Sequence, residues 1–170
     1  MLAICLLVVA VLLVSFFTAG LFLTISVPGK RKPLLQIPVS PGYEFATRII
    51  HSVQLTPVVE YFTVGADGLI YATGADFQDL GWGLPSTVSG TTEVSGGKIR
   101  IRDLSVSLAE IPFRVSHINE PKLVLITDGI SICLSGIACD GDSLRIRVER
   151  RPSYTRLFGG VKNAEFADPL

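Results

Sequence analysis

The sequence predicts an all-β domain, either an antiparallel sandwich or a partly open barrel of about eight or nine short strands, preceded by one transmembrane helix. Three observations support this prediction. From Leu34 to Arg150, short runs rich in β-branched and aromatic residues alternate with Gly, Pro and Asp. No stretch of that region repeats its apolar residues with the period of about 3.6 that a helix needs. Residues Leu2 to Val27, in contrast, contain no charged side chain.

The apolar N-terminal segment is long enough to cross a membrane as a helix. At about 1.5 Å per residue, Leu2–Val27 would extend over roughly 39 Å, which exceeds the roughly 30 Å of a hydrocarbon core. A secretory signal peptide has a basic start and a shorter apolar region. We therefore expect residues 1–27 to be an uncleaved anchor, with a signal sequence as the alternative, and residues 28–33 to be a linker.

The strands of the domain are predicted from short runs between turn residues. The clearest run is the last, in which aliphatic and charged residues alternate from Leu144 to Glu149, as in a strand with one buried face. Asp-Gly pairs within Gly65–Leu69 and Thr127–Ile130 predict tight turns, because Gly readily adopts a positive φ. Residues 34–151 thus form the predicted domain, and the polar residues 152–170 a disordered tail. The predicted strands are Leu34–Val39, Glu44–His51, Val58–Val64, Leu69–Phe77, Lys98–Arg102, Glu110–Ser116, Lys122–Thr127, Ile130–Leu134 and Ser143–Arg150.

Charge and cysteine content exclude some functions. The chain has 15 Lys and Arg against 15 Asp and Glu, so it lacks the basic excess that a nucleic-acid partner requires. We also expect no cofactor. Cys133 and Cys139 are spaced too widely for the CxxC pairs of metal or redox sites. They could close a small disulfide loop outside the cytoplasm, and they would stay reduced inside it.

The stretch HSVQLTPVVEYF places a histidine and a carboxylate among apolar neighbours. His51 and Glu60 both fall on the more apolar face of the expected strands, and a two-residue turn at Leu55-Thr56 would set them opposite each other, about 5 Å apart. A longer loop would keep them on one face in any register that slips by an even number. Three interpretations stay open: a buried pair that fixes the hairpin register, the polar floor of a ligand or partner site, and a catalytic pair.

Catalysis and metal binding are disfavoured by geometry. Ser52 cannot be a nucleophile that His51 activates, because adjacent side chains of a strand point to opposite faces. The chain also lacks a G-x-S-x-G turn, and we predict no enzymatic activity. The other histidine, His117, has no ligand partner two or four residues away, so we predict no metal site, although His51, His117 and Glu60 could in principle converge.

The stretch DFQDLGWGLP contains the single tryptophan of the chain. Gly81 and Gly83 flank Trp82, and Pro85 ends the turn. Trp82 either caps one end of the β core or lines the mouth of a ligand site together with His51 and Glu60. These three side chains form the predicted ligand-binding site.

Three segments, HSVQLTPVVEYF, DGLIYATGADFQDLGWGLP and LRIRVERR, resemble a bacterial family of small uncharacterised proteins, catalogued as domain of unknown function eighteen-fifty. The similarity extends from about Leu34 to Arg151. It implies a short secreted or single-span protein, encoded beside tripartite transporters of the TAXI-type TRAP class, and it carries no enzymatic activity. The residues that it assigns, as motif positions alone, are His51, Ser52, Pro57, Glu60, Gly81, Gly83 and Pro85.

The side of the membrane is predicted from two signals that disagree. Lys30–Lys32 follow the apolar segment, and the positive-inside rule would keep the domain in the cytoplasm. The family implies export, although its usual basic leader is missing here. We expect a single-pass protein of the cell membrane with its domain on the extracytoplasmic, periplasmic side.

The expected function is that of a non-enzymatic accessory to a TAXI-type TRAP transporter. Its expected partners are the membrane and the TRAP permease or its solute-binding protein. One alternative is a free-standing β module that binds a small ligand at His51, Glu60 and Trp82. The second alternative is an uncharacterised enzyme.

Overall fold

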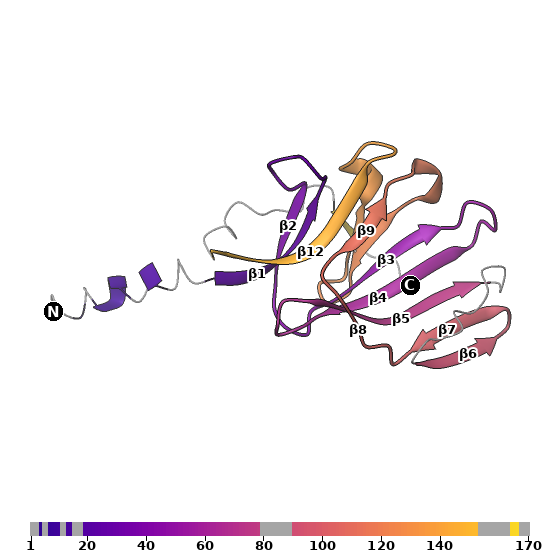
Figure 1. Cartoon of the computed structure of the whole chain (residues 1–170), viewed down its shortest axis with the longest axis horizontal. Coiled ribbons are helices and arrows are strands. Elements are labelled where there is room, and N and C mark those ends of the chain that lie inside the picture. The colour runs from indigo at the N-terminus through magenta and orange to yellow at the C-terminus, as the bar shows by residue number, and fades with distance from the viewer. Residues whose placement is uncertain are drawn as a thin grey trace.

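The computed structural model consists of two antiparallel β-sheets that enclose one main core (Figure 1). It describes residues 4, 7–10, 13–14, 19–78, 90–152 and 164–166. Sheet A has four strands in the order β2-β1-β12-β9, and sheet B has nine, in the order β13-β11-β10-β3-β4-β5-β7-β6 with β8 paired to β5. The strands are β1 Ala19–Ser26, β2 Leu35–Val39, β3 Glu44–Ile50, β4 Pro57–Val64, β5 Ile70–Gln78, β6 Thr91–Ser95, β7 Lys98–Arg102, β8 Val106–Leu108, β9 Ile111–Arg114, β10 Lys122–Leu125, β11 Ile130–Cys133, β12 Ser143–Pro152 and β13 Ala164–Phe166. Two short 3₁₀ turns, η1 (His117–Asn119) and η2 (Leu134–Gly136), complete the described elements.

The all-β prediction is confirmed, and each predicted strand corresponds to an observed one. Four observed strands, β1, β6, β8 and β13, lie outside the predicted set. Both Asp-Gly turns are present, with φ of 85° at Gly68 and 66° at Gly129. Part of the tail that the sequence predicts to be disordered is a strand, because β13 pairs with β11.

The prediction of one helix from Leu2 to Val27 is wrong for the second part of that segment. Residues Ala19–Ser26 form β1, the strand between β2 and β12 in sheet A. Leu23 and Ile25 are fully buried in the core, and Phe22 and Thr24 are buried on the opposite face of the strand. A strand buried on both faces has the same continuous apolar sequence as a membrane helix, so hydropathy alone cannot separate the two.

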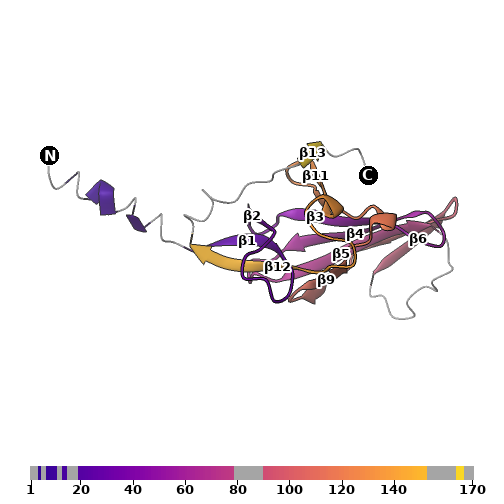
Figure 2. The ribbon, with the colours of Figure 1, turned by 90° about the horizontal axis from the view of Figure 1, so that it is seen from above.

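The residues before β1 include the described helical positions 4, 7–10 and 13–14, which lie away from both sheets (Figures 1 and 2). Among the described residues, no helix combines the length and the apolar character needed to span a membrane. The predicted linker at residues 28–33 is instead the loop between β1 and β2, within the domain.

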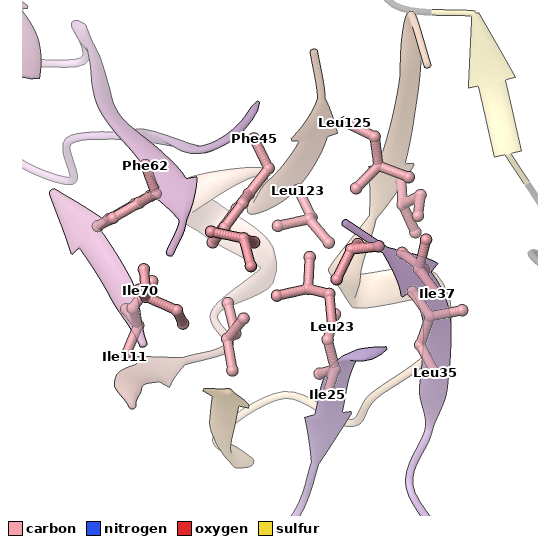
Figure 3. Packing of buried hydrophobic residues seen from close by; sticks show 14 of the residues in the cluster. Leu23, Ile25, Leu35, Ile37, Phe45, Phe62, Ile70, Ile111, Leu123 and Leu125 are labelled. Atoms are coloured by element: carbon pink, nitrogen blue, oxygen red, sulfur yellow. The ribbon is translucent and has the colours of Figure 1, made fainter. Parts of the chain in front are cut away.

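The core lies between the two sheets. Leu23, Ile25 and Ile37 of sheet A face Phe45, Leu123 and Leu125 of sheet B (Figure 3). The rings of Phe45 and Phe62 stack with their centroids 5.3 Å apart. Alternation along β12 agrees with the predicted pattern, since Leu144 and Ile146 are buried in this core. The residues that alternate with these two on β12, such as Arg145 and Arg147, point away from the core.

The position of β1 in the core predicts a large stability loss for Leu23→Ala. Leu23 is 0% exposed, and truncation of a buried leucine lowers the free energy of unfolding by about 2–5 kcal/mol. Val53→Ala is the control, because Val53 is 81% exposed and should change stability by no more than about 0.5 kcal/mol. Chemical denaturation of the full chain measures both. Equal effects of the two substitutions would show that β1 is not a core strand.

Candidate functional site

The predicted pair of His51 and Glu60 is not formed. The register of β3 and β4 sets Thr47 opposite Glu60, and the Thr47 hydroxyl donates a hydrogen bond to the Glu60 carboxylate at 3.3 Å. His51 lies four residues beyond Thr47, about 13 Å further along the chain. The loop between the strands comprises residues 51–56. The Leu55 N–H donates a hydrogen bond to the His51 carbonyl at 2.8 Å and closes this loop, and Leu55 has a positive φ of 54°. A two-residue turn at Leu55-Thr56 is therefore wrong.

The other predicted site residues do not join a common site in the described part of the chain. Trp82, Gly81, Gly83 and Pro85 lie outside the described residues, so their role stays a prediction. Ser52 is exposed in the 51–56 loop. The backbone N–H of His117, in η1, donates to Asp140 Oδ1 at 2.9 Å. Within the described ranges, no group of three or more His, Cys, Asp or Glu side chains could hold a metal ion.

The two domain cysteines are separate thiols in this structure. Cys133 and Cys139 are both free and exposed. The Cys133 sulfur lies 3.1 Å from the Ser135 hydroxyl oxygen. The bridge that the sequence left open is therefore not formed here.

The face of sheet B that points away from sheet A carries a basic groove. Strand pairing sets Lys122 opposite Arg48, Arg48 opposite Val59, Val59 opposite Asp76, and Asp76 opposite Arg100. These side chains form one row across β10, β3, β4, β5 and β7, because residues that pair directly point to the same face. The groove has a volume of about 270 Å³, and its walls include Arg48, Lys98, Arg100 and Lys122.

The groove has more cations than carboxylates, although strand pairing sets Glu93 of β6 directly opposite Arg100 at the end of the row. Asp76 is the carboxylate in its wall, and it is already engaged by an ion pair with Arg102 and by the Tyr61 hydroxyl at 3.2 Å. Among the described residues, the four wall cations have no ion-pair partner. Lys122 and Arg48 even face each other directly, and like charges in that position are destabilising.

The floor of the groove is apolar. Val59 and Val124 line the groove and form a small buried cluster with Ala46, and Tyr61, which also lines the groove, packs against this cluster. An apolar floor under a few convergent charged groups is typical of a site for a small organic ligand. Guanidinium and ammonium groups donate charge-assisted hydrogen bonds to carboxylate or phosphate oxygens. The arrangement can therefore bind an organic anion.

One wall of the groove is held by a cluster of Tyr61, Asp76 and Arg102. The Arg102 guanidinium lies over the Tyr61 ring, 5.2 Å from its centroid. Gly74 lies beside this cluster, because a Cβ there would come within 2.6 Å of the Ile101 carbonyl oxygen, which accepts from the Arg102 guanidinium at 2.9 Å. Burial raises the pKa of Tyr61, and the charge of Asp76 raises it further. Tyr61 therefore stays neutral near pH 7 and donates to Asp76.

This groove is absent from the predicted sites, although the sequence contains a signal for it. The stretch KIRIR at Lys98–Arg102 alternates cations with isoleucines, which predicts a strand with one basic face. Arg48 likewise lies on the outward face of sheet B, opposite Val59. What the sequence does not show is that pairing brings Arg48, Arg100 and Lys122 into one row.

A comparison with protein-family models finds one match. The model described as "Domain of unknown function (DUF1850)" matches residues 45–133, slightly more than half of the 170-residue chain. The matched region extends from β3 to β11 and contains the four wall cations of the groove. No curated protein and no solved structure matches the chain.

The Tyr61 cluster predicts a shift of a measurable pKa. In Asp76→Asn the neighbouring negative charge is gone, so the pKa of Tyr61 should fall towards its ordinary value of 10.0. A raised folded-state pKa stabilises the fold below pH 10.0, and this stabilisation is lost as the pH rises through the raised value. NMR titration of the tyrosine rings measures the shift. Asp67→Asn is the control: it removes the carboxylate that raises the pKa of Tyr71 and should leave Tyr61 unchanged. An unchanged Tyr61 pKa in Asp76→Asn would contradict the described cluster.

Proposed function

The chain belongs to the DUF1850 family, and from that premise we propose that it is a non-enzymatic accessory protein which binds an organic anion in the basic groove of sheet B. It acts on the extracytoplasmic side of the cell membrane, beside a TAXI-type TRAP transporter whose permease or solute-binding protein is its partner. The observation that carries the proposal is a set of four cations around an apolar floor, none of which forms an ion pair with another described residue.

The distribution of charge favours a dicarboxylate. Arg48 and Lys122 lie on one side of Val59, and Lys98 and Arg100 lie on the other. Arg48 and Arg100 are separated by three strand spacings, about 14 Å between their backbones, and both have long side chains that reach inward. A ligand with a carboxylate at each end meets a cation at each end. The volume of about 270 Å³ fits a small metabolite, since pockets for drug-sized ligands start at about 300 Å³.

Binding is favoured over catalysis by the ionisation of the groups in the groove. Arginine and lysine side chains are protonated near pH 7 and have no lone pair with which to accept a proton. Tyr61, with its raised pKa, is neutral and already bonded to Asp76. These groups orient an anion and neutralise its charge, and they do not transfer protons to or from it.

The apolar residues before β1 are the proposed membrane anchor. Residues 2–18 number about 17, the lower limit for a helix that spans the bilayer. In this arrangement the eight residues of β1, at about 3.3 Å each, separate the anchor from Lys30–Lys32 by about 26 Å. These cations still lie within the roughly 15–20 residues over which the positive-inside rule counts charges. The extracytoplasmic side is therefore proposed from the family resemblance and against this rule.

The proposed ligand class predicts that a groove variant loses affinity. We expect Arg48→Gln with Arg100→Gln to weaken the binding of succinate by at least about tenfold, because each lost charge removes charge-assisted hydrogen bonds. Isothermal titration calorimetry on the full chain in a nonionic detergent measures this. Arg114→Gln is the control, since Arg114 is an exposed cation on β9 of the other sheet. The proposal fails if the wild-type chain binds no dicarboxylate, or if control and groove variant lose affinity equally.

The proposed side of the membrane predicts the labelling of the two exposed thiols. Because Cys133 and Cys139 are free and exposed, a membrane-impermeant thiol reagent should modify them in intact cells. A variant with both residues changed to serine is the control for other labelled thiols. Labelling that requires permeabilised cells would place the domain in the cytoplasm and would overturn the transporter part of the proposal.

A further inference from the structure

A second basic hollow lies on the outer face of sheet A, on different strands from the groove of sheet B. The alternation of β12 points Arg145, Arg147 and Arg151 away from the core. The loop between β1 and β2 contributes Lys30 and Arg31. Figure 1 shows β12 next to β1 and β2, the strands that this loop connects. The hollow has a volume of about 280 Å³.

The cations of this hollow exceed the carboxylates that they meet. Glu110 forms ion pairs with Arg147 at 2.6 Å and with Arg145 at 3.6 Å. Glu149 pairs with Arg151 at 2.6 Å. In the part of the chain that the structure describes, Lys30 and Arg31 pair with no carboxylate. Five cations thus face two carboxylates, which leaves an excess of positive charge.

A hydroxyl group and a loop complete the hollow. Thr24 and Ser26 both line its floor. Thr24 is 1% exposed and its hydroxyl donates to the Phe22 carbonyl at 3.4 Å, so Ser26 supplies the hydroxyl that faces a ligand. Two backbone hydrogen bonds stabilise the loop. The Lys30 N–H donates to the Val27 carbonyl at 3.1 Å, and the Leu34 N–H donates to the Ile25 carbonyl at 2.8 Å. These bonds fix the backbone from which the Lys30 and Arg31 side chains project.

We propose that this hollow binds a phosphate group. A tetrahedral phosphate presents oxygens in several directions, so it can accept from arginine, lysine and hydroxyl donors at the same time. The adjacent sequence makes a phospholipid headgroup one source of that phosphate. Strand β1 continues directly from the N-terminal apolar residues, of which Ile4, Leu7 and Val14 are 68%, 65% and 67% exposed. Inorganic phosphate is the other source. The hollow shares no lining residue with the groove of sheet B.

The test is calorimetric titration of the full chain in a nonionic detergent with two probes, inorganic phosphate and short-chain phosphatidylglycerol. Lys30→Gln with Arg31→Gln should weaken the binding of both by at least about tenfold, since it removes two charged donors. Both residues are exposed on a loop, so the variant should keep the wild-type melting temperature. Arg114→Gln with Arg150→Gln is the matched control: it removes the same charge from two exposed positions that line neither basic surface, and it should leave phosphate binding unchanged.

Each result has a definite meaning. Phosphatidylglycerol that binds more tightly than inorganic phosphate, while phosphatidylcholine does not bind, identifies the lipid as the source. Phosphate binding without lipid binding supports the site with free phosphate as its ligand. The proposal is overturned if the wild-type chain binds neither probe, or if the two double variants weaken binding equally. Succinate binding that fails while phosphate binding persists would remove the dicarboxylate proposal alone.

Discussion

Strand β1 holds sheet A together, and the rest of the fold depends on the burial of both of its faces. It pairs with β12 from Ala19 to Ser26 and with β2 from Leu21 to Ile25. In the described part of the chain, β2 has no other strand partner. Complete burial of a side chain such as Leu23 or Ile25 contributes about 1.5–3 kcal/mol. Without β1, strand β2 would have no partner in sheet A, and the side of the core that sheet A covers would be exposed to solvent. The apolar residues before Ala19 are thus joined directly to a core strand.

A chain with equal numbers of acidic and basic residues can still have two surfaces with an excess of cations, because several of its carboxylates lie elsewhere. Several of them stabilise turns. Asp67 accepts from the Leu69 N–H at 3.0 Å, and this bond lowers the pKa of Asp67. Asp128 accepts from the Tyr43 hydroxyl at 2.5 Å, and Asp142 from the Cys139 N–H at 3.1 Å. The cations instead lie on the outward positions of long strands, where the register gathers them.

For the site predicted around His51, the strand faces were correct and the register of the hairpin was wrong. The faces of β3 and β4 were assigned correctly, since Phe45 and Phe62 both point into the core. The position of His51 along the hairpin was predicted incorrectly, because that position depends on the length of the loop. Leu55 adopts a positive φ, which is uncommon for a residue with a side chain. A six-residue loop then moves the register by four positions and sets Thr47 opposite Glu60.

The sequence by itself determined the all-β class, the positions of the predicted strands and the inward faces of β3 and β12, because local alternation and Asp-Gly turns depend on neighbouring residues only. It also determined the family, through segments that stay contiguous. Only the tertiary structure decided that Ala19–Ser26 is a strand and that Arg48, Arg100 and Lys122 share one groove. Both outcomes depend on pairing between segments far apart in the chain. β1 pairs with β12 more than a hundred residues later, and no local pattern encodes that contact.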